Sequence, residues 1–558
     1  MTREPLLPEP LSEELAARIA AEPDRTLPEI APDAAAARSL RGRAFDLRRG
    51  AWQVLCPLDS DSVILDLECD LGATGRSLAR NCARVVGRDL NAARRTVARA
   101  VNRETGVGNF EVEEAAPDEA WPGGPLRGVL LGPVTLRRAG SARADRVRLL
   151  AEARARLGDG GWLCVRLPSG RALGPEGPAA SDLPGAGDWP RLLTDAGFDV
   201  AEVWLPLPDQ GHADTLVPWP GTDPRIALRA YGVRKAWKLA LMSLPGLRDR
   251  VPRDLLVIGR LGRVHRPPAL RDAHGAPLDP RRVYLNRDRG SVWYGGREGE
   301  RIRDVTIADG AADTLRRLRA VRDAWAGDPE APAFFRGWEL GGREDRPWAD
   351  RPNVSGLPLS SLGDLTDDHH DAVLRRLRAL QRIGPRVDLP VMDLTAVLEH
   401  FLDASLRTSP PAGWLERLRR CAVALVARFP GDRVVLQHGD VTPNNVLYHR
   451  GHAELIDWDL ATPADFPGYD ALNLLLYSRC GPDPEPGYWA GLVAACADGA
   501  VPEDVAEWLA AACGPADPVP AVARFWLLRA ARGTGFGEAW VERHGRPALE
   551  RAEEWLRP

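Results

Sequence analysis

The sequence predicts an α/β protein in two parts: a doubly wound parallel sheet, and then a small antiparallel lobe followed by a larger α-rich lobe. In the first half, short apolar runs alternate with helical stretches, which is the pattern of a parallel sheet covered by helices on both faces. From residue 281 onward, strand-like runs come first and helical runs follow. With 558 residues, 44% of them hydrophobic, the chain can form several domains with sizeable cores.

The first half begins with a Pro- and Ala-rich arm, residues 1–40, in which a helix is expected at 11–21. Residues 63–67 (Val-Ile-Leu-Asp-Leu) form a short apolar run typical of a buried parallel strand. Helical stretches at 76–80 and 92–102 follow the first two strands. The strand candidates are 63–67, 84–90, 109–113, 127–132, 161–166, 197–204 and 254–258.

The composition indicates the cellular compartment of the protein and which classes of binding partner it favours. The formal net charge of −4 is near balance for this length and indicates neither nucleic acid nor an anionic membrane as a partner. The eight cysteines are scattered without a Cys-x-x-Cys pair, which favours buried thiols in a reducing compartment. The start of the sequence lacks the apolar run of a signal peptide, and no run approaches bilayer length. We therefore expect a cytoplasmic protein without a transmembrane segment.

Two segments precede the second half. Residues 225–247 form a basic amphipathic stretch that contains the only lysines, Lys235 and Lys238. Such a helix could dock on a membrane surface or an acidic partner, or it could pack on its own domain. Residues 263–280 are polar and contain prolines, and they form the best candidate for a linker between domains.

The second half reads as a small lobe and a large lobe. Strands are expected at 282–285, 290–294 and 303–307, then a helix at 311–325 and further strand-like residues at 334–340. Helices at 367–382, 393–405, 413–428 and 502–512, with several more from 520 to 555, make the large lobe α-rich.

A polar hairpin stands out within the large lobe. Residues 446–449 and 453–457 are β-prone and flank a tip that contains Gly451. Asn445 and Asp457 each lie six residues from Gly451, so the hairpin sets them nearly opposite each other, and Asp440 lies just upstream. Phosphoryl transfer requires such a set: one Asp to orient the acceptor hydroxyl and take its proton, and an Asn and an Asp to hold Mg²⁺. The alternative is an ordinary hairpin whose polar residues cap turns.

These residues resemble the aminoglycoside phosphotransferase and choline kinase family, a branch of the bilobal protein-kinase-like fold. The family pattern is matched by His438-Gly439-Asp440, Asn445 and Ile456-Asp457-Trp458, and Gly468-Tyr469-Asp470-Ala471 resembles the segment that follows it. The resemblance implies that Asp440 is the catalytic base and that Asn445 and Asp457 are Mg²⁺ ligands. It also implies that His438 and Asp470 support the catalytic loop, that residues 281–360 and 361–558 are the two lobes, and that ATP and Mg²⁺ are the cofactors.

The small lobe departs from this family at one point. The family holds the nucleotide phosphates with a strand lysine that a helix glutamate orients, but no lysine follows Lys238. Thr306 stands where the lysine is expected, and Arg303 is the nearest basic residue on that strand. The helix at 311–325 carries arginines where the glutamate belongs. Arg303 is therefore the candidate for binding the nucleotide phosphates, since guanidinium binds phosphate well.

Residues 41–262 resemble class I S-adenosylmethionine-dependent methyltransferases, whose fold is a Rossmann-like doubly wound sheet. Asp66, Gly72 and Asp89 match the cofactor-binding positions of that family. Glu68 and Asp70, however, stand where two of its glycines belong, and their side chains would crowd the cofactor and oppose its carboxylate. The segment 115–119 also departs from the pattern expected near the adenine. Binding of S-adenosylmethionine is therefore doubtful, and an altered scaffold is the expectation.

Three functions remain open from the sequence. The first is an ATP- and Mg²⁺-dependent phosphotransferase acting on a hydroxyl of a small molecule, favoured by Asp440, Asn445 and Asp457. The second is a non-catalytic scaffold or binding subunit, favoured by the missing lysine and glycines. The third is a methyltransferase with a kinase-like accessory domain, against which Glu68 and Asp70 argue. Aminoglycosides, sugars, amino alcohols and natural-product intermediates all fit the first.

Overall fold

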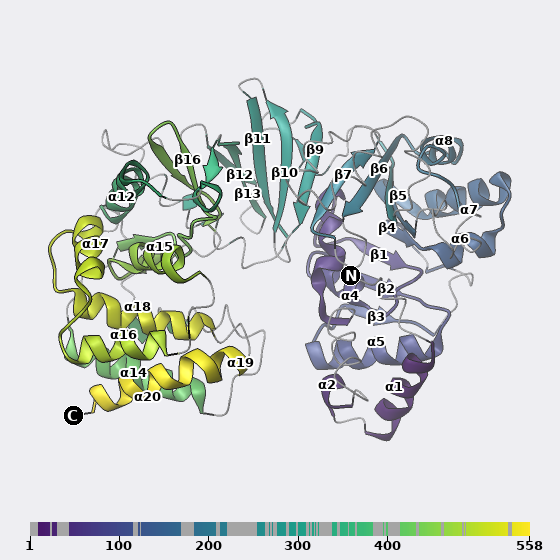
Figure 1. Cartoon of the computed structure of the whole chain (residues 1–558). Coiled ribbons are helices and arrows are strands. Elements are labelled where there is room, and N and C mark those ends of the chain that lie inside the picture. Colours follow the sequence, from purple (N-terminus) through teal and green to yellow (C-terminus); the bar gives the residue numbers. More distant parts are fainter. Residues whose placement is uncertain are drawn as a thin grey trace, which may run out of the picture. The chain divides into compact units, whose positions relative to one another are not determined.

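The chain folds into two compact units, of which each has its own core. A computed structural model shows unit 1 as residues 1–312 with 337–353, and unit 2 as residues 313–336 with 354–558 (Figure 1). The residues that the structure describes are 9–22, 25–30, 44–114, 121–122, 124–168, 183–207, 213–219, 254–262, 267, 270–271, 276–285, 289–296, 299–307, 312, 315–316, 318–319, 322, 338–342, 346–354, 356–362, 365–382, 394–395, 398–399, 413–430, 435–458, 462–481, 485, 487–533 and 538–557. The segment 115–119, the basic stretch 225–247 and most of the predicted helices 311–325 and 393–405 lie outside them.

The described residues of unit 1 form one sheet of thirteen strands in the order β12-β13-β11-β10-β9-β7-β6-β8-β5-β4-β1-β2-β3. Strands β3, β2, β1, β4 and β5 are parallel to one another, and β8 runs antiparallel between β5 and β6. Its strands are β1 (Val63–Asp66), β2 (Arg84–Gly87), β3 (Phe110–Val112), β4 (Leu126–Leu131), β5 (Leu157–Pro168), β6 (Val200–Leu207), β7 (Thr215–Trp219), β8 (Asp254–Arg260), β9 (Pro280–Leu285), β10 (Arg289–Gly296), β11 (Gly299–Thr306), β12 (Glu339–Gly342) and β13 (Pro347–Pro352).

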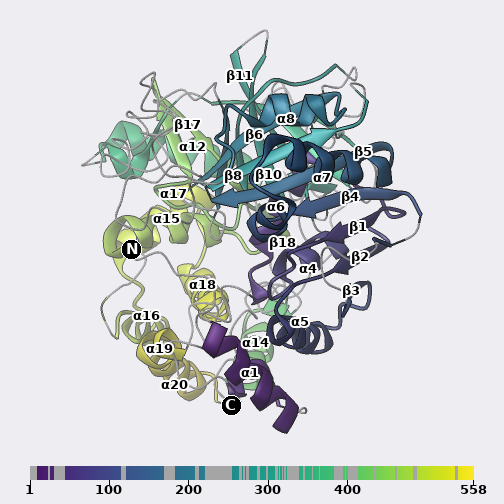
Figure 2. The ribbon, with the colours of Figure 1, turned by 90° about the vertical axis from the view of Figure 1, so that its right-hand side faces the viewer.

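Helices cover both faces of the parallel strands, because alternate residues of a strand point to opposite faces. On β1, Leu65 joins a core with Leu136, Leu150 and other residues of α6–α8, whereas Ile64 joins a second core with residues of η2 and α4. Figures 1 and 2 show α6, α7 and α8 together on one side of this sheet. The helices are α1 (Glu9–Ala21), α2 (Leu27–Ile30), η2 (Leu47–Leu55), α4 (Ala73–Ala79), α5 (Ala92–Thr105), α6 (Pro133–Ala139), α7 (Arg143–Arg156) and α8 (Trp189–Asp195).

The strands predicted for the small lobe continue this sheet. β7 pairs with β9 through Thr215↔Tyr284 and Leu216↔Val283, and β9 to β13 extend the sheet with antiparallel pairs. Val283 and Val292 are buried in the same core as η2 and α4. The predicted linker 263–280 therefore does not separate two sheets, and the two compact units divide after residues 312, 336 and 353. The sequence also gave no indication of β7 or β13.

Unit 2 is largely helical, as predicted, and it contains the polar hairpin. Its helices are α12 (Asp367–Gln381), α14 (Trp414–Arg428), α15 (Tyr469–Cys480), α16 (Tyr488–Ala497), α17 (Glu503–Cys513), α18 (Pro518–Gly533), α19 (Glu538–Trp540), η9 (Val541–Gly545) and α20 (Arg546–Trp555), with η5 at Leu359–Ser361. Its strands are β14 (Leu357–Pro358), β15 (Val435–Gln437), β16 (Val446–His449), β17 (His452–Leu455) and β18 (Thr462–Asp465).

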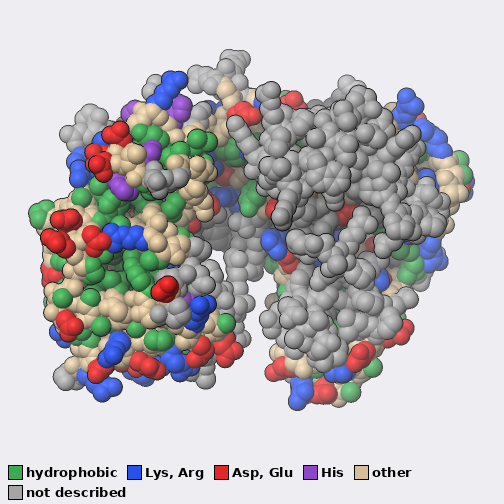
Figure 3. All heavy atoms as spheres, viewed as in Figure 1, with side chains coloured by type: hydrophobic (Ala, Val, Ile, Leu, Met, Phe, Trp, Pro, Cys, Tyr) green, Lys and Arg blue, Asp and Glu red, His purple; other side chains and the backbone are tan. Residues whose placement is uncertain are grey.

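The described surface of unit 2 has no single dominant charge. Figure 3 shows acidic, basic and hydrophobic side chains interspersed over the visible part of this unit. Among the described residues, no helix combines the length and the apolar composition needed to cross a bilayer.

Candidate active site

The hairpin is formed by β16 and β17, which pair antiparallel from Val446↔Leu455 to His449↔His452. Arg450 and Gly451 make a two-residue turn, and both have positive φ values, 47° and 80°. Two successive positive φ values are the mark of a type I′ turn, which matches the right-handed twist of the strands. At the open end, the Ile456 N–H donates to the Asn445 carbonyl over 2.9 Å, so Asn445 and Asp457 lie at the same end of the hairpin, as predicted.

Asp470 fixes the loop that carries Asp440. It lies in the first turn of α15, is fully buried, and accepts the backbone N–H groups of His438 and Gly439 at 2.5 and 2.8 Å. Gly439 has φ +79°, a conformation that favours glycine. Burial raises the pKa of Asp470 to about 7, although the two N–H donors oppose this shift. The contact of Asp470 with the loop is thus formed by hydrogen bonds from main-chain N–H groups, including that of His438, to the Asp470 carboxylate.

His438 links the loop of Asp440 to the segment that carries Asp457. Its Nδ1 accepts the Asp440 N–H at 3.3 Å, so Nε2 carries the proton and donates to the Ile456 carbonyl at 2.9 Å. Burial lowers the pKa of this imidazole to about 4, which keeps it neutral. The Trp458 ring lies 4.6 Å from it, between centroids. The neutral His438 ring therefore connects the backbone of Asp440 with that of Ile456, the residue before Asp457.

Asp440 contacts Asn445 directly. The Asn445 Nδ2 donates to the Asp440 carboxylate at 2.8 Å and to the Asp440 carbonyl at 3.0 Å. Burial raises the pKa of Asp440; the nearby positive charge of Arg532 opposes this, the Asp457 charge adds to it, and Arg529 also opposes it. A carboxylate made more basic in this way is suited to accept a proton.

Asp457 has an unusual backbone. It is exposed and adopts φ +64°, in the left-handed region that side chains other than Gly, Asn and Asp rarely adopt. Strained conformations of this kind cluster at functional sites.

The Asn445 amide nitrogen donates to Asp440, which leaves the Asn445 Oδ1 for another partner. Within the described part of the chain, no hydrogen bond to this oxygen occurs. One carboxylate and one amide oxygen are the ligand types that Mg²⁺ prefers, so these residues fit that ion.

Arg303 is engaged elsewhere. It is fully buried, its Nε and Nη2 donate to Asp350 at 3.1 and 2.6 Å, and its guanidinium lies 4.1 Å from the centre of the Trp348 ring. The Thr306 hydroxyl donates to the Pro347 carbonyl at 2.8 Å. The phosphate-binding role predicted for Arg303 is not supported, because its charge already neutralises a buried carboxylate inside the sheet.

The carboxylates expected at the S-adenosylmethionine site bind their own loops. Asp89 accepts the Asp70 N–H at 3.1 Å through one oxygen and the Asn91 N–H at 2.9 Å through the other. Asp66 accepts the Arg166 guanidinium at 2.9 Å. Both carboxylates are buried, and burial is the main cause that raises each pKa.

Side chains also pack closely against the loop that contains Gly72. A Cβ on Gly72 would lie 2.6 Å from the Phe110 ring, which also closes on Gly75 and Gly87, so packing of Phe110 explains these glycines. The Glu68 carboxylate accepts the Thr135 N–H at 2.6 Å and fills the space beside Gly132. Asp70, which stands where the methyltransferase pattern has a glycine, has φ +49°, in the left-handed region that favours glycine. The packing of Phe110 and Glu68 therefore accounts for the close contacts of this loop, and weak binding of S-adenosylmethionine stays a prediction.

Sequence reasoning missed three residues near Asp440: Asn473, Arg529 and Arg532. Asn473 lies one helical turn after Asp470 on α15, and its Nδ2 donates to the Val441 carbonyl at 3.1 Å. Arg532 donates to the Tyr469 hydroxyl at 2.7 Å. The helical spacing of Asn473 from Asp470 was a usable signal; the arginines of α18 carried none, because arginine is abundant throughout the chain.

A family model matches part of the chain. Residues 293–526 match the family model described as phosphotransferase enzyme family, so this part of the chain is a phosphotransferase-family domain, and the resemblance seen in the sequence is confirmed. A search of curated proteins found no match.

Solved structures resemble the chain at low similarity. An rRNA methylase from Streptococcus thermophilus shares 13% identity, covering 39% of this chain and 98% of its own, with a TM-score of 0.23. A precorrin-6y C5,15-methyltransferase from Geobacter metallireducens shares 12%, covering 38% and 87%, with a TM-score of 0.23. WbdD, crystallised with a kinase inhibitor, shares 16%, covering 93% and 92%, with a TM-score of 0.23. Values this low support no conclusion about activity.

Proposed function

We propose that unit 2, with the strands of the small lobe, is an ATP- and Mg²⁺-dependent phosphotransferase that acts on a hydroxyl of a small molecule. The observation that carries this proposal is the pair of hydrogen bonds from Asn445 to Asp440. The loop that contains Asp440 is fixed by hydrogen bonds from its backbone to the Asp470 carboxylate. A hairpin with merely structural polar residues has no need of a buried carboxylate that fixes the loop before it. The match to the phosphotransferase family supports the same reading.

Asp440 would orient the acceptor hydroxyl and take its proton, and its raised pKa favours that step. Asn445 and Asp457 would hold Mg²⁺, which supplies charge stabilisation to the phosphoryl group when it is bound. His438 keeps Asp440 and the Asp457 segment at fixed separation because it is neutral and bonded on both ring nitrogens.

The N-terminal part of unit 1 would act as a scaffold for this domain. The side chains of Glu68 and Phe110 fill the region that corresponds to the cofactor loop, and the β7–β9 pairing joins the parallel strands to the small lobe.

The test uses the full chain in two assays. Calorimetry should show ATP binding that requires Mg²⁺ in the wild type and is lost in Asp457→Ala. Asp440→Asn should bind Mg-ATP as the wild type does but transfer phosphate to hydroxyl compounds, or hydrolyse ATP, about 10²–10⁴-fold more slowly. Equal Mg-ATP binding in wild type and Asp457→Ala would refute the metal assignment, and an unchanged rate in Asp440→Asn would refute the base.

A further inference from the structure

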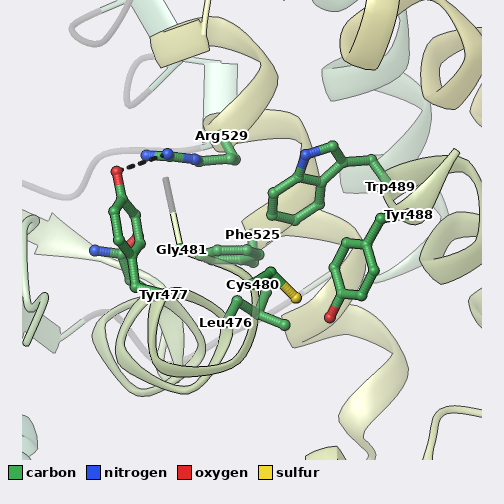
Figure 4. Close-up of a pocket in the computed structure, with 9 residues that line it drawn as sticks. Leu476, Tyr477, Cys480, Gly481, Tyr488, Trp489, Phe525 and Arg529 are labelled. Atoms are coloured by element: carbon green, nitrogen blue, oxygen red, sulfur yellow. Dashed lines mark hydrogen bonds between the residues drawn. The ribbon is translucent and has the colours of Figure 1, made fainter. Parts of the chain in front are cut away.

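Unit 2 contains a small cavity between α15, α16 and α18, with the rings of Tyr488, Trp489 and Phe525 around it (Figure 4). Its volume is about 10 Å³, which leaves room for about one water molecule. Because a substrate does not fit there, this cavity adds no ligand site to the one proposed above. A contact that does bear on the phosphotransferase lies in unit 1.

Asn81 follows α4 in the Rossmann-like part of unit 1, residues 41–262, and it contacts the small lobe. Its Nδ2 donates to the Ile307 carbonyl at 2.7 Å and to the Gln53 Oε1 at 2.6 Å, so both amide hydrogens are used. Ile307 comes directly after β11, a strand inside the family match, whereas Asn81 lies outside that match. A side chain from outside the family domain therefore holds the end of one of its strands.

Further hydrogen bonds fix Asn81 itself. Gln53 is buried, and its Nε2 donates to the Ser77 hydroxyl at 3.1 Å, which orients the Gln53 Oε1 toward Asn81. The Asn81 carbonyl accepts from Arg346 at 2.7 Å, and Arg346 also donates to the Leu58 carbonyl at 2.7 Å. Arg346 directly precedes β13, the strand that pairs with β11. Asn81 thus contacts the small lobe through both its side chain and its main chain.

The contact at Ile307 is buried. Ile307 is 2% exposed and packs in one core with Leu78 of α4 and Cys82. Apolar packing has no preferred direction, so it does not fix the orientation of the Ile307 carbonyl, whereas a hydrogen bond does. A buried carbonyl that loses its donor is destabilised, and it regains a partner only by moving. Loss of the Asn81 amide should therefore displace the end of β11.

The end of β11 matters for the nucleotide because of Thr306, its last residue. By the resemblance stated above, Thr306 stands where the family has the lysine that binds the nucleotide phosphates. The Thr306 hydroxyl donates to the Pro347 carbonyl at 2.8 Å, and Arg303 on the same strand is bound to Asp350 at 2.6 Å. These contacts hold side chains within the sheet, and the Asn81 contact holds the main chain directly after Thr306.

Resting on the phosphotransferase function above, we propose that Asn81 is a positioning residue for nucleotide binding. It fixes the end of β11 from outside the family domain, so the affinity for Mg-ATP depends on a side chain of the Rossmann-like part. Its action is indirect, because it holds a main-chain carbonyl and none of the groups proposed to bind the metal or the acceptor. The Rossmann-like part then sets the geometry of the small lobe in addition to covering its apolar face.

The test compares two asparagines in the full-length protein. Asn81→Asp keeps the size of the side chain and removes both donated hydrogen bonds. Asn109→Asp is the matched control, because the Asn109 Nδ2 also donates to two oxygens, the carbonyls of Ala79 and Cys82 at 2.7 and 2.9 Å, which both lie in the Rossmann-like part. Mg-ATP affinity is measured by calorimetry well below the melting temperatures, and amide hydrogen exchange is followed without ligand in a peptide that covers 300–307.

Asn81→Asp should weaken Mg-ATP binding about three- to tenfold and speed amide exchange in 300–307. Asn109→Asp should lower Tm as well but change neither quantity. Asn81→Ala removes the same hydrogen bonds without adding a charge; it should give the same two changes, and it decides if Asn81→Asp does not fold.

Two results would overturn the role of Asn81 while the phosphotransferase function stands. One is wild-type binding of Mg-ATP with unaltered affinity in the Asn81 variants, whatever their exchange rates. The other is equal weakening in Asn109→Asp, because affinity would then follow general stability. Absence of Mg-ATP binding in the wild type would instead refute the phosphotransferase function and, with it, this role of Asn81.

Discussion

Replacing Asp457 by glycine should stabilise the protein alone and remove its stabilisation by Mg-ATP. Asp457 has φ +64° and is exposed, so its backbone is strained while its side chain has little packing to lose. The left-handed conformation costs a residue other than glycine about 1–2 kcal/mol, and aspartate at the low end of that range. Glycine gives back about 0.5–1 kcal/mol through its greater freedom in the unfolded chain. The net gain is therefore between about 0 and 0.5 kcal/mol.

The ligand effect is larger and has the opposite sign. At a free Mg-ATP concentration about 100 times Kd, binding stabilises the folded wild type by about 2.7 kcal/mol. For a unit of this size, 1 kcal/mol corresponds to a shift of about 2–4 °C in Tm. Thermal melts should therefore show Asp457→Gly at or slightly above the wild type without ligand, and about 5–10 °C below it with Mg-ATP.

Arg450 supplies the matched control, since it has φ +47° at the exposed tip of the same hairpin. Arg450→Gly should give a similar small gain without ligand and keep the full Mg-ATP shift. If Asp457→Gly retains that shift, Asp457 does not hold the metal. If it clearly destabilises the protein without ligand, the strain argument is wrong.

Three further predictions concern burial and charge. Folding lowers the pKa of the His438 imidazole from 6.5 to about 4. Between these two pH values only the unfolded chain binds a proton at this imidazole, so the free energy of unfolding should fall by up to about 3 kcal/mol from pH 6.5 to pH 4. Denaturant titrations of His438→Gln should lack this fall relative to wild type; the raised pKa of Asp470 acts in the opposite direction in both proteins and cancels in the comparison. Arg303→Met should destabilise the protein by about 1.5–3 kcal/mol, since buried Asp350 loses one of its two arginine partners and keeps Arg301, and a stable variant with selectively weaker nucleotide binding would contradict this. S-adenosylmethionine should bind the full chain weakly or not at all by calorimetry, because Glu68 and Asp70 stand where the methyltransferase pattern has glycines, and sub-micromolar binding would contradict this.

The sequence predicted what depends on local pattern. The strand at 63–67 was visible because a short apolar run can be buried on both faces, and the turn at Gly451 because two residues of positive φ are needed between β16 and β17. The support of the Asp440 loop by Asp470 was implied by the family resemblance.

What the sequence did not predict depends on distant packing. Arg303 was assigned to phosphate because its partner Asp350, 47 positions later, could not be recognised before β11 and β13 were paired. Gly72 was assigned to a cofactor because a glycine looks the same in the sequence whether a ligand or a protein side chain packs against it. In the structure, the Phe110 ring packs against Gly72. Asn473 was missed because its importance lies in one hydrogen bond to Val441.

The pairing of β7 with β9 has a practical consequence for producing the phosphotransferase part alone. The family match begins at residue 293, inside β10, so a gene cut there would remove β9 and the first residues of β10. A cut at 281 would keep β9 but leave its edge without β7, and would expose Val283 and Val292 where η2 and α4 now cover them. Unpaired edges and bared apolar faces favour aggregation. Inclusion bodies from such truncated genes would therefore reflect a severed sheet, and soluble material should be sought from the undivided gene.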